Sequence, residues 1–158
     1  MLGDDIDTDA LAPGRYMKSD VPEIARHCLE SIAPRFAKEV RFGDVVVAGR
    51  NFGTGSSREQ APAALKHLGV AALVAPSFAG LFYRNALNLG LPALVCPQAK
   101  RIQDGDELKI DYEKSEILDL TTRRSLAFEP IAPHLMDMLL DGGLVAHLEK
   151  RLKWRTTS

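Results

Sequence analysis

Apolar residues in the first hundred positions form short continuous runs separated by helix-length segments. The runs at 44–48, 70–75 and 93–96 are apolar at consecutive positions except for the opening Asp44, which is typical of strands buried on both faces of a parallel sheet. The segment between the first two runs predicts a helix that ends at Leu68, and residues 78–89 predict another, with Ser77 as its candidate N-cap. This alternation of strand and helix predicts a parallel sheet with right-handed crossovers.

The remaining segments predict shorter elements around this sheet. Residues 21–30 have the spacing of an amphipathic helix, with Pro22 in its first turn. After position 100, short alternating stretches separated by polar turns predict strands, and two helices close the chain; these elements are expected at 107–111, 116–120, 125–128, 133–140 and 144–152. Since we find no repeat or linker, we predict a single domain over residues 1–158 of the α/β class, with central parallel strands flanked by helices and additional short strands.

The most informative stretch is the glycine loop, residues 51–61 (Asn-Phe-Gly-Thr-Gly-Ser-Ser-Arg-Glu-Gln-Ala). Ser56 and Glu59 have the spacing of a capping box, which predicts that a helix begins here and presents unpaired N–H groups that attract anions. Arg58 adds a guanidinium suited to a carboxylate or a phosphate. The loop therefore predicts an anion site with a hydroxyl, Ser56 or Ser57, available for chemistry.

Three common loop motifs do not fit these residues. A nucleotide-binding P-loop needs a Gly-Lys pair, which is absent, and a dinucleotide fingerprint needs a third glycine at the position of Arg58. The hydrolase elbow G-x-S-x-G needs a glycine where Glu59 stands. The simplest remaining alternative is a helix-capping loop with a surface arginine.

Composition narrows the function further. The net charge of −1 gives no electrostatic indication of a nucleic acid or an anionic membrane as partner. Two distant cysteines, Cys28 and Cys96, do not make a disulfide framework or a self-contained metal or iron–sulfur site. No apolar run is long enough to span a membrane and no signal peptide opens the chain, so we expect a cytoplasmic protein.

Two further segments carry chemistry. Residues 3–9 (Gly-Asp-Asp-Ile-Asp-Thr-Asp) are acidic but miss the glycine of a calcium loop, so an exposed acidic turn is the simpler interpretation. In residues 13–19, Arg15 and Lys18 either meet an acidic ligand or lie in a solvated loop. Arg84 and Asn85 either reach the site or anchor a helix, and we favour the structural role. The histidines show no partner spacing, and we assign none of them to catalysis.

Taken together, residues 3–9, 13–16, 51–59, 77–79 and 82–85 resemble the small subunits of 3-isopropylmalate dehydratase (isopropylmalate isomerase), in the aconitase superfamily. The resemblance covers nearly the whole chain, which starts almost at the Asp-Thr-Asp motif, so we expect a shortened opening strand. It implies a swivelling β/β/α domain that closes over a large subunit carrying a [4Fe–4S] cluster on its own cysteines. This chain would itself bind no cofactor and no metal.

The resemblance also implies a reaction and a set of site residues. The reaction is a reversible hydro-lyase step in which water leaves a hydroxy acid and returns at the neighbouring carbon; for isopropylmalate this belongs to leucine biosynthesis. Ser56 falls on the catalytic base, which Arg58 and helix N–H groups would support, and Asp9 falls on an active-site aspartate that orients a group of the partner chain. The cluster of the partner, as a Lewis acid, would take the leaving hydroxide. Residues predicted to bind the substrate are Ser57, Arg58, Arg15 and Lys18.

The substrate remains open at this point. Residues 16–19 fall on the segment that sets specificity in the family, where isopropylmalate enzymes tend to present apolar residues and homoaconitase-like enzymes an arginine. Lys18 is a cation, so a homoaconitase or a citramalate-type dehydratase is an alternative, unless its side chain extends into solvent. A non-catalytic anion-binding or regulatory module is an alternative of a different class. Self-association of the isolated subunit is a further possibility.

Overall fold

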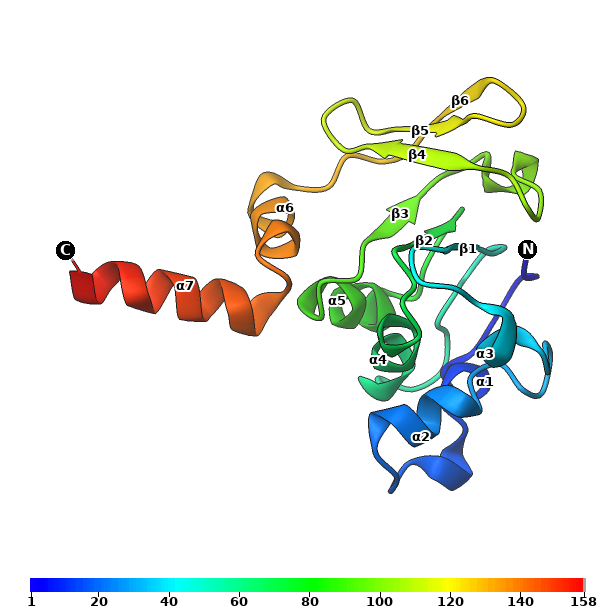
Figure 1. Ribbon diagram of the computed structural model, residues 1–158, viewed down its shortest axis with the longest axis horizontal. Helices are drawn as coiled ribbons and strands as arrows, with labels where there is room; N and C mark the ends of the chain where they lie inside the picture. Colours follow the sequence, from blue (N-terminus) through cyan, green and yellow to red (C-terminus); the bar gives the residue numbers. More distant parts are fainter. Residues whose placement is uncertain (158) are drawn as a thin grey trace.

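A computed structural model describes residues 1–157, and its centre is a three-stranded parallel sheet (Figure 1). The sheet has the order β1 (Val45–Val47), β2 (Ala72–Ala75), β3 (Ala93–Val95). Helix α4 (Gln60–His67) joins β1 to β2, and α5 (Gly80–Asn88) joins β2 to β3. The predicted parallel sheet is therefore confirmed, and all four residues of its middle strand are buried as a double-sided strand requires.

The two faces of this sheet pack against different layers. Side chains of Val46, Leu73 and Ala93, which are register partners, belong to the core cluster that includes the buried faces of α4, α5 and the helix α2 (Val21–Arg26). The next residues along the strands, Val47, Val74 and Leu94, belong to a second cluster. Alternate residues of a strand point to opposite faces, so one sheet separates two cores.

The second core lies under an antiparallel sheet, drawn in yellow-green to orange above the parallel one (Figure 1). Its strands are β4 (Leu108–Asp111), β5 (Glu116–Asp119) and β6 (Arg124–Ala127), in sequence order. Ile117 and Leu126 are register partners whose buried side chains face the parallel sheet. The layers are therefore antiparallel sheet, parallel sheet, helices, which agrees with the expected β/β/α arrangement.

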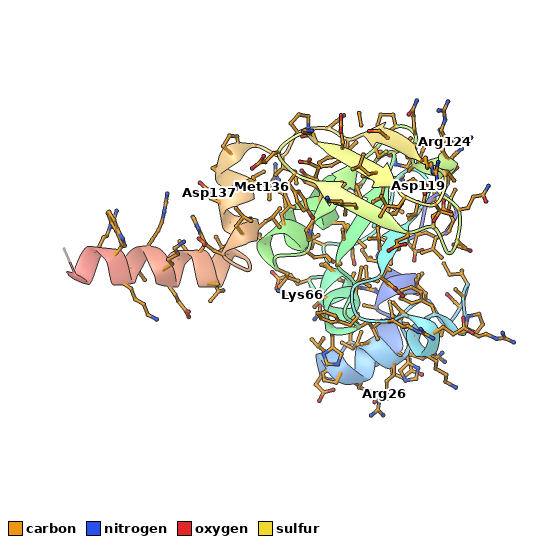
Figure 2. All side chains as sticks on the ribbon, turned by 45° about the horizontal axis from the view of Figure 1, so that its top comes forward. Arg26, Lys66, Asp119, Arg124, Met136 and Asp137 are labelled. Carbon is orange, nitrogen blue, oxygen red and sulfur yellow. The ribbon has the colours of Figure 1, made fainter. Side chains whose placement is uncertain are left out.

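The other helices are short, apart from those at the C-terminus. Helix α2 ends four residues earlier than predicted, because the chain turns over residues 27–32 and Leu29 adopts a φ of 61°. The last helix continues past its predicted end and projects from the body of the molecule, with side chains extending on several sides (Figures 1 and 2). The remaining helices are α1 (Thr8–Leu11), η1 (Gly14–Tyr16), α3 (Phe36–Glu39), η2 (Ala99–Arg101), α6 (Pro133–Leu140) and α7 (Leu144–Thr157). No helix within residues 1–157 has the length and apolar character to cross a membrane.

Both predicted side-chain caps are wrong. Helix α4 begins at Gln60 rather than near Ser56, and its N-cap residue Glu59 makes no side-chain cap bond. Helix α5 begins at Gly80, and Ser77 instead accepts a hydrogen bond from the backbone N–H of Asn51 over 2.8 Å. Both serine hydroxyls bond to segments distant in the chain, so tertiary contacts override the local capping pattern.

Candidate functional site

The acidic segment at the N-terminus lies alongside the glycine loop. Asp7 forms a parallel bridge with Thr54, and the backbone N–H of Thr8 donates to Thr54 O over 2.8 Å. Upstream, an oxygen of Asp4 accepts from the backbone N–H of Arg50 over 2.7 Å, and the Asp5 carboxylate accepts from the Asn51 side chain over 3.0 Å. The acidic residues of segment 3–9 are exposed, as expected, but the segment is not an isolated turn, because the Asp4 and Asp5 carboxylates fasten it to the loop.

Two glycines allow the loop to approach its neighbours closely. Gly53 has a φ of 84°, and a Cβ atom built on it would lie 2.1 Å from Cγ of Phe82. Gly55 has a φ of 108°, and its Cβ would lie 3.1 Å from Oγ1 of Thr8. Side chains are disfavoured at both positions by the backbone conformation and by the neighbours. The glycines thus bring the following residues, Ser56 to Arg58, against α1.

Ser56 is exposed, and among the described residues its hydrogen bonds go to the buried Thr8. The Ser56 backbone N–H donates to Thr8 Oγ1 over 3.1 Å, and the two hydroxyl oxygens lie 3.2 Å apart. Within residues 1–157, no titratable side chain hydrogen-bonds to Ser56. The first turn of α4 begins four residues later, so support for the Ser56 hydroxyl comes from Thr8 rather than from a helix N-terminus.

Arg58 and Asp9 form an ion pair beside this hydroxyl. Nη1 of Arg58 donates to Asp9 Oδ1 over 2.9 Å and to the carbonyl oxygen of Ala12 over 3.0 Å. The bond from Arg58, with a second from the Gly14 N–H over 2.8 Å, holds the pKa of the Asp9 carboxyl below its usual value. Asp9 was expected to orient a group of another chain; here its Oδ1 orients Arg58, while the side chain as a whole is 66% exposed.

The structure also places Ser57 and Asn85 at this site. Ser57 is exposed, and its carbonyl oxygen accepts a hydrogen bond from the Asn85 side chain over 3.2 Å. We favoured a purely structural role for Asn85 because its helix position alone does not reveal the loop in front of it. Its contact ties α5 to the loop, so Asn85 and Thr8 are the two residues at the site that sequence reasoning missed.

The two predicted substrate cations on the next loop are placed differently. Arg15 donates to Glu30 over 2.5 Å and lies over the ring of Tyr16, with its Cζ atom 5.0 Å from the ring centroid. Tyr16 stacks in turn on His27, with ring centroids 3.7 Å apart. Lys18 is exposed and has no hydrogen-bond partner among the residues that the structure describes. Arg15 is thus directed at Glu30, whereas Lys18 remains available to a ligand.

The histidines have partners that the sequence spacing did not reveal to us. His27 lies 2.7 Å from a Glu30 oxygen through Nδ1 and 3.2 Å from a Glu23 oxygen through Nε2, and the bond with Glu30 is the main cause that raises its pKa. His147 lies 2.7 Å from the Asp141 carboxylate. The statement that these histidines lack partner spacing is therefore wrong, although neither of them hydrogen-bonds to the glycine loop.

Residues 1–157 contain no ligand set for a metal cluster. Cys28 and Cys96 lie in separate cores, and burial raises the pKa of the Cys28 thiol to about 12, which disfavours the thiolate that binds metals. In the part of the chain that is described, no three histidine, cysteine or acidic side chains are grouped to hold an ion. A [4Fe–4S] cluster therefore does not fit the residues of this chain.

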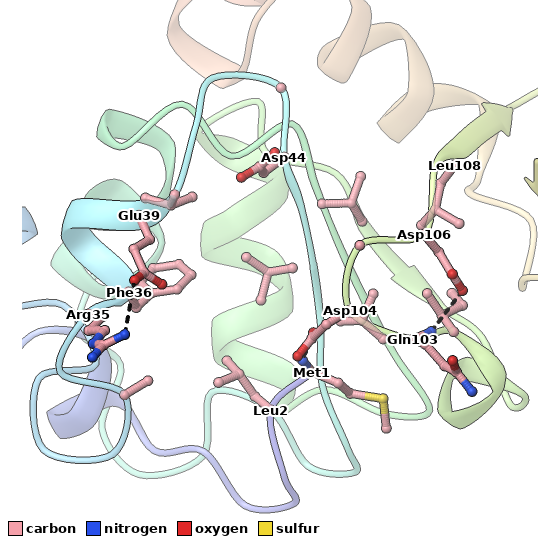
Figure 3. A pocket seen from close by; sticks show the side chains of 18 of the residues that line it. Met1, Leu2, Arg35, Phe36, Glu39, Asp44, Gln103, Asp104, Asp106 and Leu108 are labelled. Atoms are coloured by element: carbon pink, nitrogen blue, oxygen red, sulfur yellow. Dashed lines mark hydrogen bonds and ion pairs between the residues drawn. The ribbon is translucent and has the colours of Figure 1, made fainter. Parts of the chain in front are cut away.

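Two grooves lie away from the glycine loop. One, of about 930 Å³, opens between α3, β1 and residues 102–108, and Figure 3 shows Phe36, Asp44 and Asp104 around it. The other, of about 860 Å³, lies between α6 and α7. Neither is lined by Ser56, Arg58 or Asp9. Ser56 and Asp9 are exposed and Arg58 is half-buried, so this group of residues is reached from the surface.

Residues 31–99 match the Aconitase C-terminal domain family, which covers the parallel sheet, its helices and the glycine loop. The chain is 49% identical to the 3-isopropylmalate dehydratase small subunit of Moorella thermoacetica, over 96% of this chain and 93% of that one. It is 48% identical to a methanogen homoaconitase small subunit from Methanothermobacter thermautotrophicus, over 96% and 88% of the two chains. The crystal structure of a 3-isopropylmalate dehydratase from Methanocaldococcus jannaschii matches with a TM-score of 0.93 and 44% identity, covering 99% of this chain and 93% of that one.

These similarities extend along nearly the full length of the chain and include its fold. The chain belongs to the family of 3-isopropylmalate dehydratase small subunits, within the aconitase superfamily.

Proposed function

We propose that this chain is the small subunit of a two-subunit hydro-lyase that interconverts 2-isopropylmalate and 3-isopropylmalate by dehydration and rehydration. The observation that carries the proposal is the convergence of Ser56, Arg58 and Asp9 at one surface, built from two segments almost fifty residues apart. The nearly full-length similarity to small subunits of this enzyme class supports the same conclusion. The 158 residues act as one swivelling domain.

The residues of this chain supply the base and the anion contacts. Removal of a proton from the carbon next to a carboxylate leaves enolate-like negative charge, which cations and N–H donors stabilise. Ser56, exposed at the end of the glycine loop, takes the proton. Arg58 binds a substrate carboxylate; its two bonds to Asp9 and Ala12 both use Nη1, so they fix the guanidinium while its other nitrogens stay available. Ser57 adds a hydroxyl from the adjacent position.

A large subunit completes the site. The exposure of Ser56 and Ser57 and the absence of a metal-ligand set in residues 1–157 support an arrangement in which the partner holds the [4Fe–4S] cluster and closes over the loop. The names of the relatives, all small subunits, support the same assembly. Cytoplasmic location and self-association of the isolated chain stay predictions.

Two observations favour a second substrate class. Lys18 is exposed on the loop that follows α1 and can meet an additional carboxylate, and one relative of 48% identity is a homoaconitase small subunit. A homoaconitate or citramalate-type substrate is therefore the second candidate. Arg15 is a weaker candidate contact, because its guanidinium already pairs with Glu30.

The test is reconstitution with an iron–sulfur large subunit. The chain alone should be inactive, and the mixture should turn over isopropylmalate, with homoaconitate and citramalate assayed beside it. Ser56→Ala should lower kcat by about 10²-fold or more, the usual contribution of a positioned base, while leaving assembly intact. Ser125→Ala, a change of the same size on the exposed strand β6, is the matched control.

Two results would contradict the proposal. A Ser56→Ala complex with the normal rate would remove the base assignment. Assembly without turnover of any of the three acids would favour a non-catalytic anion-binding module.

A further inference from the structure

The hydroxyl beside Ser56 belongs to a residue that is sealed from solvent. Thr8 lies in the first turn of α1 and is 2% exposed, whereas Ser56 is exposed. Its backbone is fixed on both sides, because its N–H donates to Thr54 O and its carbonyl oxygen accepts from the Ala12 N–H, each over 2.8 Å. Thr8 therefore presents Oγ1 to the glycine loop from a rigid position.

The hydrogen bonds of this hydroxyl can be counted. A threonine hydroxyl has one hydrogen to donate and two lone pairs to accept with. One lone pair of Thr8 accepts the Ser56 N–H, and the only other polar side-chain atom bonded to it in residues 1–157 is Ser56 Oγ, 3.2 Å away. The Thr8 hydrogen consequently has one described acceptor, the Ser56 oxygen.

The chain is shaped to permit this approach. The Cβ position at Gly55 lies 3.1 Å from Thr8 Oγ1, so a side chain at Gly55 would crowd the hydroxyl. The Asp-Thr-Asp motif and the glycine motif therefore meet at this pair of hydroxyls. The neighbouring cation does not replace Thr8, because the described bonds of Arg58 go to Asp9 and Ala12.

We propose that Thr8 is a positioning residue that donates its O–H to Ser56 Oγ whenever Ser56 is deprotonated and so favours the alkoxide that acts as the base. The inference rests on the proposed function. Ser56 loses its proton to solvent before the substrate binds; in the reaction the C–H bond of the substrate breaks, its electron pair stays on the substrate as the enolate-like charge, and the proton forms the new Ser56 O–H. Thr8 keeps its own proton throughout and exchanges the donor role for the acceptor role.

The reconstituted two-subunit enzyme tests this with two replacements of similar shape. Thr8→Val removes the hydroxyl, and Thr8→Ser retains it. A hydrogen bond to a charged group accounts for roughly a 10- to 100-fold effect on an equilibrium, so Thr8→Val should lower kcat by about that factor. It should also move the ascending limb of the kcat–pH profile to higher pH by about one unit or more. KM should change by less than about threefold, because uniform substrate binding is untouched, and Thr8→Ser should restore the rate and the profile.

Thr54→Val is the matched control, because it makes the same hydroxyl-to-methyl change on the same loop without touching Ser56 Oγ. If Thr8 served only to hold the loop, Thr8→Val would raise KM or weaken assembly without moving the pH profile, and this would overturn the inference. A normal kcat and profile for Thr8→Val, with Ser56→Ala inactive, would overturn it while leaving the proposed function standing. An active Ser56→Ala complex would instead remove the base assignment itself.

If Thr8→Val does not assemble, Thr8→Cys provides the measurement. A thiol is a weaker donor than a hydroxyl, so the ascending limb should shift in the same direction by a smaller amount. A Thr8→Cys profile identical to that of the unmodified enzyme would overturn the inference.

Discussion

The glycine loop and the C-terminal helices are both fastened by charged and polar contacts, but over very different distances in the chain. Thr8 and Ser56 are 48 positions apart, and Asp9 and Arg58 are 49 apart. In contrast, Asp141 contacts His147 and Lys150, which lie 6 and 9 positions away. The first region needs the whole parallel sheet in place before its contacts exist, whereas the second can close as the chain turns.

The difference in sequence separation distinguishes the contacts that build the candidate site from the contacts that shape a local turn. Contacts over long loops cost more closure entropy and depend on the surrounding core, so a defect in the core reaches them. Local contacts depend on the backbone of one turn. Changes that loosen the sheet should therefore disturb Ser56 and Arg58 well before they disturb the pairing of Asp141.

The largest effect on the free energy of unfolding is expected at Gly53 in the glycine loop. Gly53→Ala adds a Cβ atom that would lie 2.1 Å from Cγ of Phe82, at a φ of 84°. Overpacking and the positive φ together should lower the free energy of unfolding by about 2–5 kcal/mol. Urea unfolding followed by circular dichroism measures this.

Gly3→Ala is the control for this change, because no atom lies within 4 Å of the added Cβ. It should alter the free energy of unfolding by less than about 0.5 kcal/mol. If Gly53→Ala were equally mild, Phe82 could move aside, and the loop would not depend on the glycine as described.

A smaller effect should distinguish long-range from local carboxylates. Asp4→Ala removes the acceptor of the Arg50 N–H, 46 positions away, and Asp111→Ala removes the acceptor of the Lys114 N–H, three positions away. Asp4→Ala should raise amide hydrogen exchange several-fold across residues 50–58, since opening of this segment becomes roughly one hydrogen bond easier.

Asp111→Ala should raise exchange only in its own turn. Mass spectrometry of the exchanged protein resolves both segments. The distinction between long-range and local contacts would be contradicted if both substitutions raised exchange over equally long segments. It would also be contradicted if Asp4→Ala left exchange at residues 50–58 unchanged.

The smallest effect should come from pH. The bond from Arg58 lowers the pKa of Asp9. The contribution of this ion pair to folding stability is therefore present above the ordinary pKa of 3.8 and is lost as the pH falls through the lower pKa of the folded state. The local bond to Glu30 raises the pKa of His27. Its contribution to folding stability is therefore complete below the ordinary pKa of 6.5 and is lost as the pH rises through the higher pKa of the folded state.

Protection factors for amide exchange should therefore fall between pH 6 and pH 8 in residues 15–30 but not in residues 50–58. His27→Gln should abolish this pH dependence, because glutamine does not titrate. A fall in the protection factors of both segments over this range would show that residues 15–30 and residues 50–58 open together.

Much of the fold could be predicted from the sequence because its apolar runs all indicate the same structure, a buried parallel sheet. Consecutive apolar residues at 72–75 and 93–95 bounded by helix-length segments require a parallel sheet, and the final helix pair follows from its Gly-Gly link. Helix starts were less predictable, because Ser56 and Ser77 match capping patterns yet bond to Thr8 and Asn51. Each serine hydroxyl could bond either to the start of the next helix or to a distant segment, and in the folded protein both bond to the distant segment.

The site could be predicted only as a list of residues. The glycine loop pointed to Arg58 and to one of two serines, and the resemblance to the family singled out Ser56 and Asp9. Neither carries information on which motif faces which. Thr8 was missed because a threonine between two aspartates has no distinctive pattern. The role proposed for it rests on its burial and on the approach of Gly55, which exist only in three dimensions.

Where α5 meets the two C-terminal helices, glycine backbones make close contacts beside the buried side chains of Leu87, Met138 and Leu139. A Cβ atom on Gly90 would lie 2.5 Å from the carbonyl oxygen of Gly142, one on Gly143 would lie 2.6 Å from that of Asn88, and Lys66 donates to Leu89 O beside them. An alanine scan would consequently report only on the part of this joint made by side chains such as Leu87, Met138 and Lys66, since the glycines in contact carry no side chain to remove. At Gly90 and Gly143 even a methyl group would have to displace a carbonyl oxygen of the facing segment, so the close approach of the C-terminal helices to α5 depends on two positions without side chains.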